Sequence, residues 1–143
     1  MFEEYLDFAV GMAREAGRIQ LSYFRGDDLA MKTKSNVSDV VTRADRESEA
    51  FIVRSILERY PTHAILGEEG GARGDAASEW RWVVDPLDGT TNYSQGLPVF
   101  CVSIALQYRG ETVVGVVYAP YLRELFTAVR GGGAWCRRGD GEP

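Results

Sequence analysis

The 143 residues are 45% hydrophobic and 26% charged, which suits one soluble globular domain with a hydrophobic core. The formal net charge of -5 argues against a general nucleic-acid binder, so we expect no nucleic-acid partner. The acidic start "MFEEYLDF" is unlike a signal peptide, no apolar run approaches a membrane span, and the two cysteines form no motif. We therefore expect a cytoplasmic protein with no membrane partner.

Two helices are expected in the first part of the chain. Residues 5–24 carry apolar residues at helical spacing, which predicts an amphipathic helix. A polar stretch follows, with a short strand expected at Val40-Val41. The stretch Thr42-Arg-Ala-Asp45 fits a capping box and is expected to open a second helix that ends at Tyr60. Asp45 is then either a helix cap or a functional carboxylate, and the local pattern leaves both open.

Short apolar segments separated by turn residues follow, and they predict strands. The segments are Ala64–Leu66, Trp80–Val84, Val99–Tyr108, Val113–Tyr118 and Glu124–Val129. The last three are expected to form an antiparallel meander, and residues 67–80 are expected to be a loop. His63, between the second helix and the first strand, is expected to be exposed. The predicted class is α+β, with two amphipathic helices packed on a mainly antiparallel sheet.

The stretch "DPLDGT" at residues 85–90 carries the chemistry. The proline after Asp85 restricts the backbone, so Asp85, the carbonyl of Leu87 and Asp88 can face one point. Oxygen ligands of this kind suit a hard divalent cation such as Mg²⁺. Gly89 and Thr90 then offer exposed N–H groups that can hold a phosphate.

A plain Asp-Pro, Asp-Gly turn is the structural alternative for this stretch. The five fixed positions would match by chance in roughly one such chain in 10⁴, which favours a functional site. Haloacid-dehalogenase phosphatases need one residue between their aspartates, whereas Asp85 and Asp88 have two. An EF-hand starting at Asp85 would need glutamate where Gly96 stands, and aspartic proteases have the order Asp-Thr-Gly.

Other candidate residues are less specific. Glu68 and Glu69 follow a predicted strand, where they are either solvated or functional. His63 is the only histidine, so sites built on several histidines or on a Ser-His-Asp triad have little support.

The blocks "KSNVSDVVTRAD", "GEE" and "WVVDPLDGTTN", with the later "GGGAWC", occur in the order and approximate spacing of the inositol monophosphatase family. The resemblance covers nearly the whole chain. It implies a lithium-sensitive phosphatase dependent on Mg²⁺ (or Mn²⁺), with the fold of the amino-terminal half of the sugar-phosphatase α/β sandwich.

The resemblance also implies roles for single residues. Glu68, Asp85 and the carbonyl of Leu87 are similar to the ligands of a first metal, and Asp85 and Asp88 to those of a second. Glu68, Leu87 and Asp88 are further expected to contact the phosphate of the substrate, and Glu68 is counted among the catalytic residues.

Gly89 and Thr90 are similar to the family's phosphate-binding residues at a helix start. Thr90 and Asp45 are similar to the pair that orients the attacking water. Lys34 and Glu69 correspond to positions that support the metal ligands.

One departure concerns the second family signature, W-D-x-A-A-G, because no tryptophan of this chain is followed by aspartate. We therefore expect residues 1–143 to be an amino-terminal α+β domain without the carboxy-terminal half. The expected substrate is a small phosphorylated polyol or sugar, first of all inositol 1-phosphate, and the full-length form is expected to be a homodimer. The alternatives are a phosphatase for fructose bisphosphate or a nucleoside bisphosphate, and a non-catalytic metal-binding or interaction half-domain.

Overall fold

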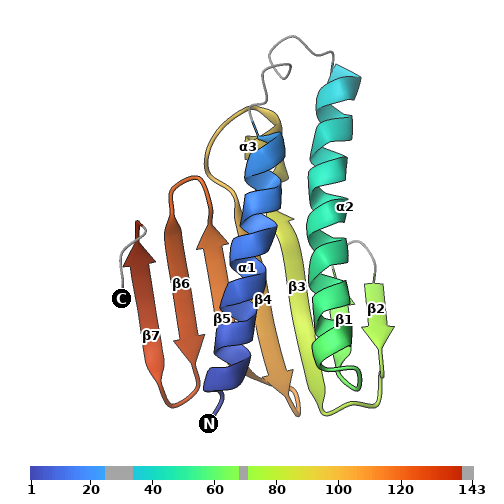
Figure 1. Ribbon diagram of the computed structural model, residues 1–143, viewed down its shortest axis with the longest axis vertical. Coiled ribbons are helices and arrows are strands. Elements are labelled where there is room, and N and C mark those ends of the chain that lie inside the picture. Colours follow the sequence, from blue (N-terminus) through green and yellow to red (C-terminus); the bar gives the residue numbers. More distant parts are fainter. Residues whose placement is uncertain (25–33, 68–70, 140–143) are drawn as a thin grey trace.

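The computed structural model describes residues 1–24, 34–67 and 71–139, apart from the side chains of residues 34–39 and 71. Two long helices lie against a seven-stranded sheet of order β2-β1-β3-β4-β5-β6-β7 (Figure 1). The pair β1–β3 is parallel and the other pairs are antiparallel. This arrangement confirms the predicted α+β class. The elements are α1 (Glu3–Tyr23), α2 (Lys34–Arg59), β1 (Ala64–Gly67), β2 (Gly71–Gly74), β3 (Trp80–Asp88), α3 (Thr90–Ser94), β4 (Cys101–Tyr108), β5 (Glu111–Ala119), β6 (Glu124–Val129) and β7 (Gly133–Arg138).

Helix α1 confirms the first predicted helix. Its buried stripe consists mostly of small residues at helical spacing, which lets the helix lie close to the sheet. The closest approach is at Gly17, where an added Cβ would lie 2.7 Å from the Tyr118 ring and 2.9 Å from Pro120 Cβ. At Gly11, on the exposed side of the same helix, no described residue outside the helix's own backbone lies within 4 Å of the corresponding point.

Helix α2 begins earlier than the sequence predicted. The strand expected at Val40-Val41 is wrong, because both residues lie inside a helix that starts at Lys34. The predicted helix start at Thr42 is wrong for the same reason, so Asp45 lies in the helix interior and does not cap it. The physical reason is tertiary packing. Buried and partly buried residues at helical spacing, from Val41 and Ala44 to Ile56, pack against the rest of the protein, and they continue the helix through Val41.

The strands β1, β3, β4, β5 and β6 confirm the five predicted segments, and β4–β6 form the predicted meander. Two further strands were not predicted. Strand β2, in the region expected to be a loop, pairs with β1, and β7 pairs with β6. Both lie at the edges of the sheet, where backbone pairing forms a strand without a buried alternating pattern. The side chains of β7 are almost all exposed.

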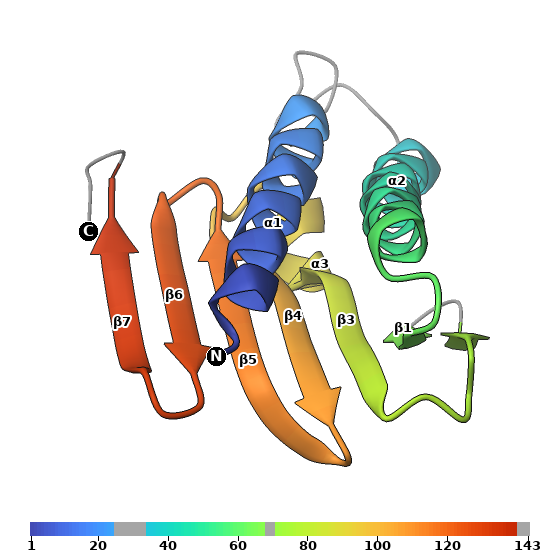
Figure 2. The ribbon, with the colours of Figure 1, turned by 60° about the horizontal axis from the view of Figure 1, so that its bottom comes forward.

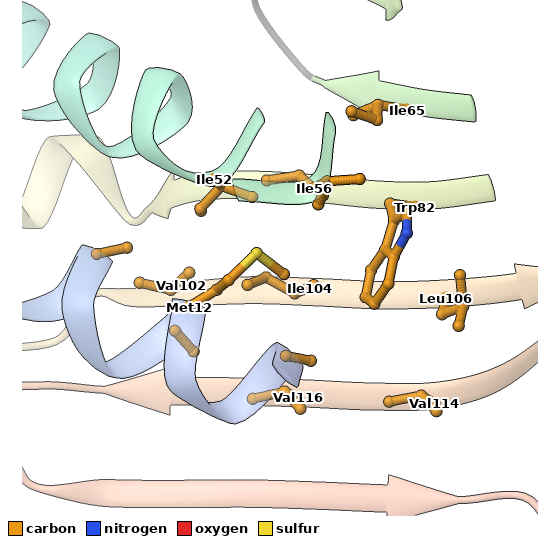
Figure 3. Close-up of a cluster of buried hydrophobic side chains, with 14 of the residues drawn as sticks. Met12, Ile52, Ile56, Ile65, Trp82, Val102, Ile104, Leu106, Val114 and Val116 are labelled. Atoms are coloured by element: carbon orange, nitrogen blue, oxygen red, sulfur yellow. The ribbon is translucent and has the colours of Figure 1, made fainter. Parts of the chain in front are cut away.

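The main core lies between the helices and one face of the sheet. Trp82 on β3 is fully buried there, surrounded by aliphatic side chains from α1, α2 and the central strands (Figure 3). Both long helices cover this same face, and β6 and β7 extend beyond α1 (Figure 2). Within the described residues, no helix is long and apolar enough to cross a membrane.

His63 is buried, so the expectation of an exposed histidine is wrong. Only 5% of the residue is exposed. Its Nδ1 accepts a hydrogen bond of 3.0 Å from Trp82 Nε1, and its ring stacks between Tyr60 and Trp80 with centroid distances of 4.7 Å and 5.5 Å. The ring satisfies the indole N–H of the largest core side chain, which the local sequence around His63 does not reveal.

The close approach of α1 to the sheet predicts opposite effects of one substitution at two glycines. Gly17→Ala should lower the free energy of unfolding by about 1–3 kcal/mol, because the methyl group overlaps Tyr118 and Pro120. Gly11→Ala should raise it by about 0.5–1 kcal/mol, because alanine is the better helix former and the space is open. Urea denaturation measures both, and a stabilising Gly17→Ala would contradict the close packing.

The burial of His63 predicts a pH dependence of stability. Burial lowers the pKa of His63, so folding favours the neutral ring. Its contribution is full above the unfolded-state pKa of about 6.5 and is lost as the pH falls from there through the folded-state pKa. The free energy of unfolding should therefore fall on acidification below pH about 6.5, before carboxylates titrate. His63→Gln keeps an acceptor for Trp82, and its free energy of unfolding should depend less on pH below about 6.5 than that of the wild-type protein. Urea denaturation at several pH values measures this, and the same pH dependence in both proteins would contradict the role of His63.

Candidate metal and phosphate site

The site begins with an irregularity at the end of β3. Asp85 pairs with Ser103 and Asp88 pairs with Cys101, so Pro86 and Leu87 together lie opposite the single residue Val102. This is a β-bulge, with two residues of one strand facing one of its neighbour. A proline fits here because the bulge takes its missing N–H out of the ladder.

The bulge places Asp85 and Asp88 on one face of the sheet. In a regular strand, residues three apart point to opposite faces. Their partners on β4, Ser103 and Cys101, are two apart and share a face, so the two aspartates also share it. One carboxylate oxygen of Asp85 is shielded from solvent, whereas Asp88 is exposed.

The thiol of Cys101 lies close to the negative charges on this face of the sheet. Its Sγ lies 3.9 Å from Asp88 Oδ2. Burial raises the pKa of the Cys101 thiol to about 11, and the negative charges of Asp88 and Asp85 contribute to the increase. Both carboxylates therefore act on the same point in space, as expected of a site that attracts a cation.

Strand β1 ends beside the bulge. Its last residue, Gly67, pairs with Val84, the neighbour of Asp85. Glu68 and Glu69, the next two predicted site residues, lie outside the described residues. Over residues 1–24, 34–67 and 71–139, no three His, Cys, Asp or Glu side chains are grouped to hold a metal ion. The described part of the chain thus supplies two carboxylates and the main chain of Leu87, all oxygen donors of the kind that Mg²⁺ prefers.

A tight turn and a short helix follow the bulge. Gly89 has a φ of 92°, and an added Cβ would lie 2.9 Å from the carbonyl oxygen of Val99. Only glycine fits both conditions. Helix α3 starts at Thr90 without a side-chain cap, so its first N–H groups are open to an external acceptor such as a phosphate oxygen. The side chain of Thr90 is exposed.

The remaining predicted residues come from α2. The side chain of Lys34, at the first position of the helix, lies outside the described residues. Asp45 is partly buried, with one carboxylate oxygen shielded from solvent. Its neighbour Ala44 belongs to the same small core cluster as Leu87 and Tyr93, which brings this part of α2 to the end of the sheet where the bulge lies.

That small cluster fixes the relative positions of the elements around the site. It joins Phe24, at the end of α1, to Tyr93 on α3 and to Phe100, with ring centroids 4.7–5.2 Å apart. In Figure 1, the ends of α1 and β3 and the start of α2 gather with α3 at one end of the molecule.

Sequence reasoning missed three residues that contact this region. Cys101 lies beside Asp88, Tyr93 is the buried residue of α3, and Gln20 on α1 bonds the carbonyl of Pro86 in the bulge. Only Gln20 carries a signal in the sequence: it is a polar residue at a position of the apolar stripe of the first helix.

Known proteins resemble this chain over nearly its whole length. The profile of the inositol monophosphatase family matches residues 1–142. Nus factor SuhB of Pasteurella multocida is 52% identical over 130 residues, covering 90% of this chain and 48% of its own.

Two solved structures superpose closely. Inositol monophosphatase from Anabaena (Nostoc) sp. PCC 7120 has a TM-score of 0.80 at 39% identity, covering 98% of this chain and 51% of its own. Extragenic suppressor protein suhB from Bartonella henselae has a TM-score of 0.79 at 39% identity, covering 94% of this chain and 52% of its own. The chain spans about half the length of these relatives. It belongs to the inositol monophosphatase family.

Proposed function

We propose that this chain carries the metal and phosphate site of a Mg²⁺-dependent phosphatase that hydrolyses a small phosphate monoester. The observation that carries the proposal is the bulge in β3, which puts Asp85 and Asp88 on one face directly before an uncapped helix start. Two carboxylates that share a face attract a cation, since a positive charge offsets their repulsion. A cation next to open N–H groups is the arrangement that a phosphate ester requires.

The cation is held by oxygen donors. Asp85, Asp88 and the carbonyl of Leu87 are its proposed ligands, together with Glu68. Bound Mg²⁺ (or Mn²⁺) supplies Lewis-acid polarisation of the phosphoryl group and lowers the pKa of water. The proposed part of this chain is to fix the ligand positions: the bulge fixes the two aspartates relative to each other, and the end of β1 fixes the chain that leads to Glu68.

The phosphate is held at the start of α3. Gly89 lets the backbone turn directly after Asp88, and the N–H groups from Thr90 onward have no side-chain cap to compete with a phosphate oxygen. Phosphate contacts from Glu68, Leu87 and Asp88 then run through the metal that these residues hold. We assign Gly89 and Thr90 as the direct phosphate-binding residues.

The attacking water is oriented by Thr90 and Asp45. The helix-cap explanation of Asp45 does not apply, since the residue lies inside α2, and a partly buried carboxylate there suits a proton acceptor. Glu68 takes part in the same step as a metal ligand. Lys34 and Glu69 are assigned to support the ligands.

The proposed substrate is inositol 1-phosphate or a similar phosphorylated polyol or sugar. The described site recognises only the phosphate end of such a molecule, so fructose bisphosphate and nucleoside bisphosphates share the same chemistry. Because the chain spans about half the length of its relatives, contacts to the rest of the substrate and the proposed homodimer belong to the longer protein.

A second candidate function is a role as an interaction domain without catalysis. The observation that favours it is that curated relatives at 43–52% identity are named Nus factor SuhB. The two functions are separated by phosphate release from inositol 1-phosphate with and without Mg²⁺.

Metal binding is tested by calorimetry with Mg²⁺. Asp85→Asn should weaken Mg²⁺ binding at least about tenfold. The reason is that substituting a residue that only hydrogen-bonds to a metal ligand already lowers metal affinity by about tenfold or more, and Asp85 is a proposed ligand itself. Asp7→Asn makes the same charge change on the exposed face of α1 and should leave the affinity unchanged. Equal affinities of Asp85→Asn and the wild-type protein would end the proposal of a metal site on β3.

Catalysis is tested in a chain completed with the second half of a related enzyme. Thr90→Ala should lower kcat by about 10²-fold with little change in KM, because the residue is proposed to orient water in the transition state. Thr90→Ser keeps the hydroxyl and should retain most of the activity. Asp45→Asn should act like Thr90→Ala at unchanged stability. A change confined to KM, or lowered stability with normal turnover, would contradict these roles.

A further inference from the structure

Gln20 is a fully buried polar residue at the end of α1. Its exposed fraction is 0%, and it stands in the stripe that otherwise consists of small and apolar residues. A primary amide loses its bonds to water on burial, which costs free energy unless the protein replaces them. The contacts of Gln20 therefore indicate what the side chain does.

Its contacts tie α1 to both parts of the candidate site. The side-chain Nε2 donates a hydrogen bond to the carbonyl oxygen of Pro86, in the bulge. The main-chain carbonyl oxygen accepts a hydrogen bond of 2.7 Å from the Tyr93 hydroxyl on α3. Burial raises the pKa of that hydroxyl, which keeps it protonated as the donor. One residue of α1 thus holds the segment on each side of Asp88 and Gly89.

The bond to Pro86 lies at the interruption of the sheet and gives a buried carbonyl a donor. Pro86 and Leu87 share one partner position on β4, so the regular ladder is interrupted at the carbonyl that Gln20 contacts. A buried carbonyl without a donor is destabilising, so the amide of Gln20 favours the bulged conformation over a regular strand. A regular strand would turn Asp85 and Asp88 to opposite faces.

The amide is not the most stabilising choice for the core itself. Gln20 Oε1 is buried, and no described residue donates a hydrogen bond to it. An aliphatic side chain of similar size would avoid this cost. The effect of the amide is instead to stabilise one conformation of the segment that it bonds at Pro86.

We propose that Gln20 is a positioning residue for residues 85–90: its amide holds the bulge in the conformation that keeps Asp85 and Asp88 together. The proposal rests on the proposed function, because that conformation creates the metal site. Gln20 touches neither metal nor substrate and acts through Pro86 and Tyr93.

Hydrogen exchange and Mg²⁺ calorimetry on the chain test the proposal. Gln20→Met keeps the length of the side chain and removes the donor. The amide of Tyr93, which bonds the Gly89 carbonyl at 2.9 Å, should exchange about fivefold to tenfold faster, as expected for the loss of one hydrogen bond. Amides of the β4–β5 ladder should keep their rates. Mg²⁺ affinity should fall by a similar factor.

Two variants serve as controls. Met12→Ala removes a buried α1 side chain from the main core, away from the bulge, and should lower overall stability without the selective effect on Tyr93 or on Mg²⁺. Gln20→Leu removes the same donor with a different shape, so that agreement with Gln20→Met excludes an effect of packing alone.

The outcomes are distinct. Unchanged exchange at Tyr93 in both Gln20 variants overturns the proposal, as does faster exchange with wild-type Mg²⁺ affinity, since the bond would then have no effect on the site. The proposal is supported if both Gln20 variants speed the exchange of the Tyr93 amide and weaken Mg²⁺ binding while Met12→Ala does neither. A wild-type chain that binds no Mg²⁺ overturns the proposed function, and the exchange rates still decide whether Gln20 holds the segment.

Discussion

A β-strand points successive side chains to opposite faces, and two aspartates three residues apart cannot share a face of a regular strand. The bulge at Pro86-Leu87 removes this constraint, and the candidate site follows from it. It brings Asp85 and Asp88 together beside Cys101, and it ends β3 at the point where Gly89 turns the chain into α3. The proposed donors for a cation and for a phosphate are thereby adjacent along the chain, at the end of β3 and the start of α3.

The rest of the fold stabilises this irregular segment. A bulge opens the ladder and requires other groups to satisfy the backbone. Here α1 supplies them through Gln20, and the aromatic rings of Phe24, Tyr93 and Phe100 exclude water behind the segment. The main core around Trp82 holds α1 and α2 on the sheet, so the small cluster at the site end is built on a rigid support.

The chain belongs to the inositol monophosphatase family, and the proposed site is built from carboxylates, a backbone carbonyl and helix N–H groups, without a histidine. The one histidine has a structural place in the core, where it accepts a bond from Trp82. Relatives are named inositol monophosphatase or Nus factor SuhB, which suggests two kinds of function, one enzymatic and one of interaction. Both are compatible with this chain, which spans about half the length of those relatives. Catalytic activity distinguishes the two functions; the position of Asp45 inside α2 excludes only its role as a helix cap.

The sequence by itself determined the α+β class, the first helix and the central strands, because these depend on local periodicity. One dense motif also made residues 85–90 the candidate site. It could not determine where α2 begins: the pattern at Thr42-Arg-Ala-Asp45 is a valid local helix start, and only packing against the small cluster shows that the helix continues through Val41. The edge strands β2 and β7 were missed because backbone pairing with a neighbour, rather than burial, forms them. Tertiary structure alone decided that His63 is buried and that Gln20 reaches Pro86, since each bond joins residues that are distant in sequence and is invisible to any local pattern.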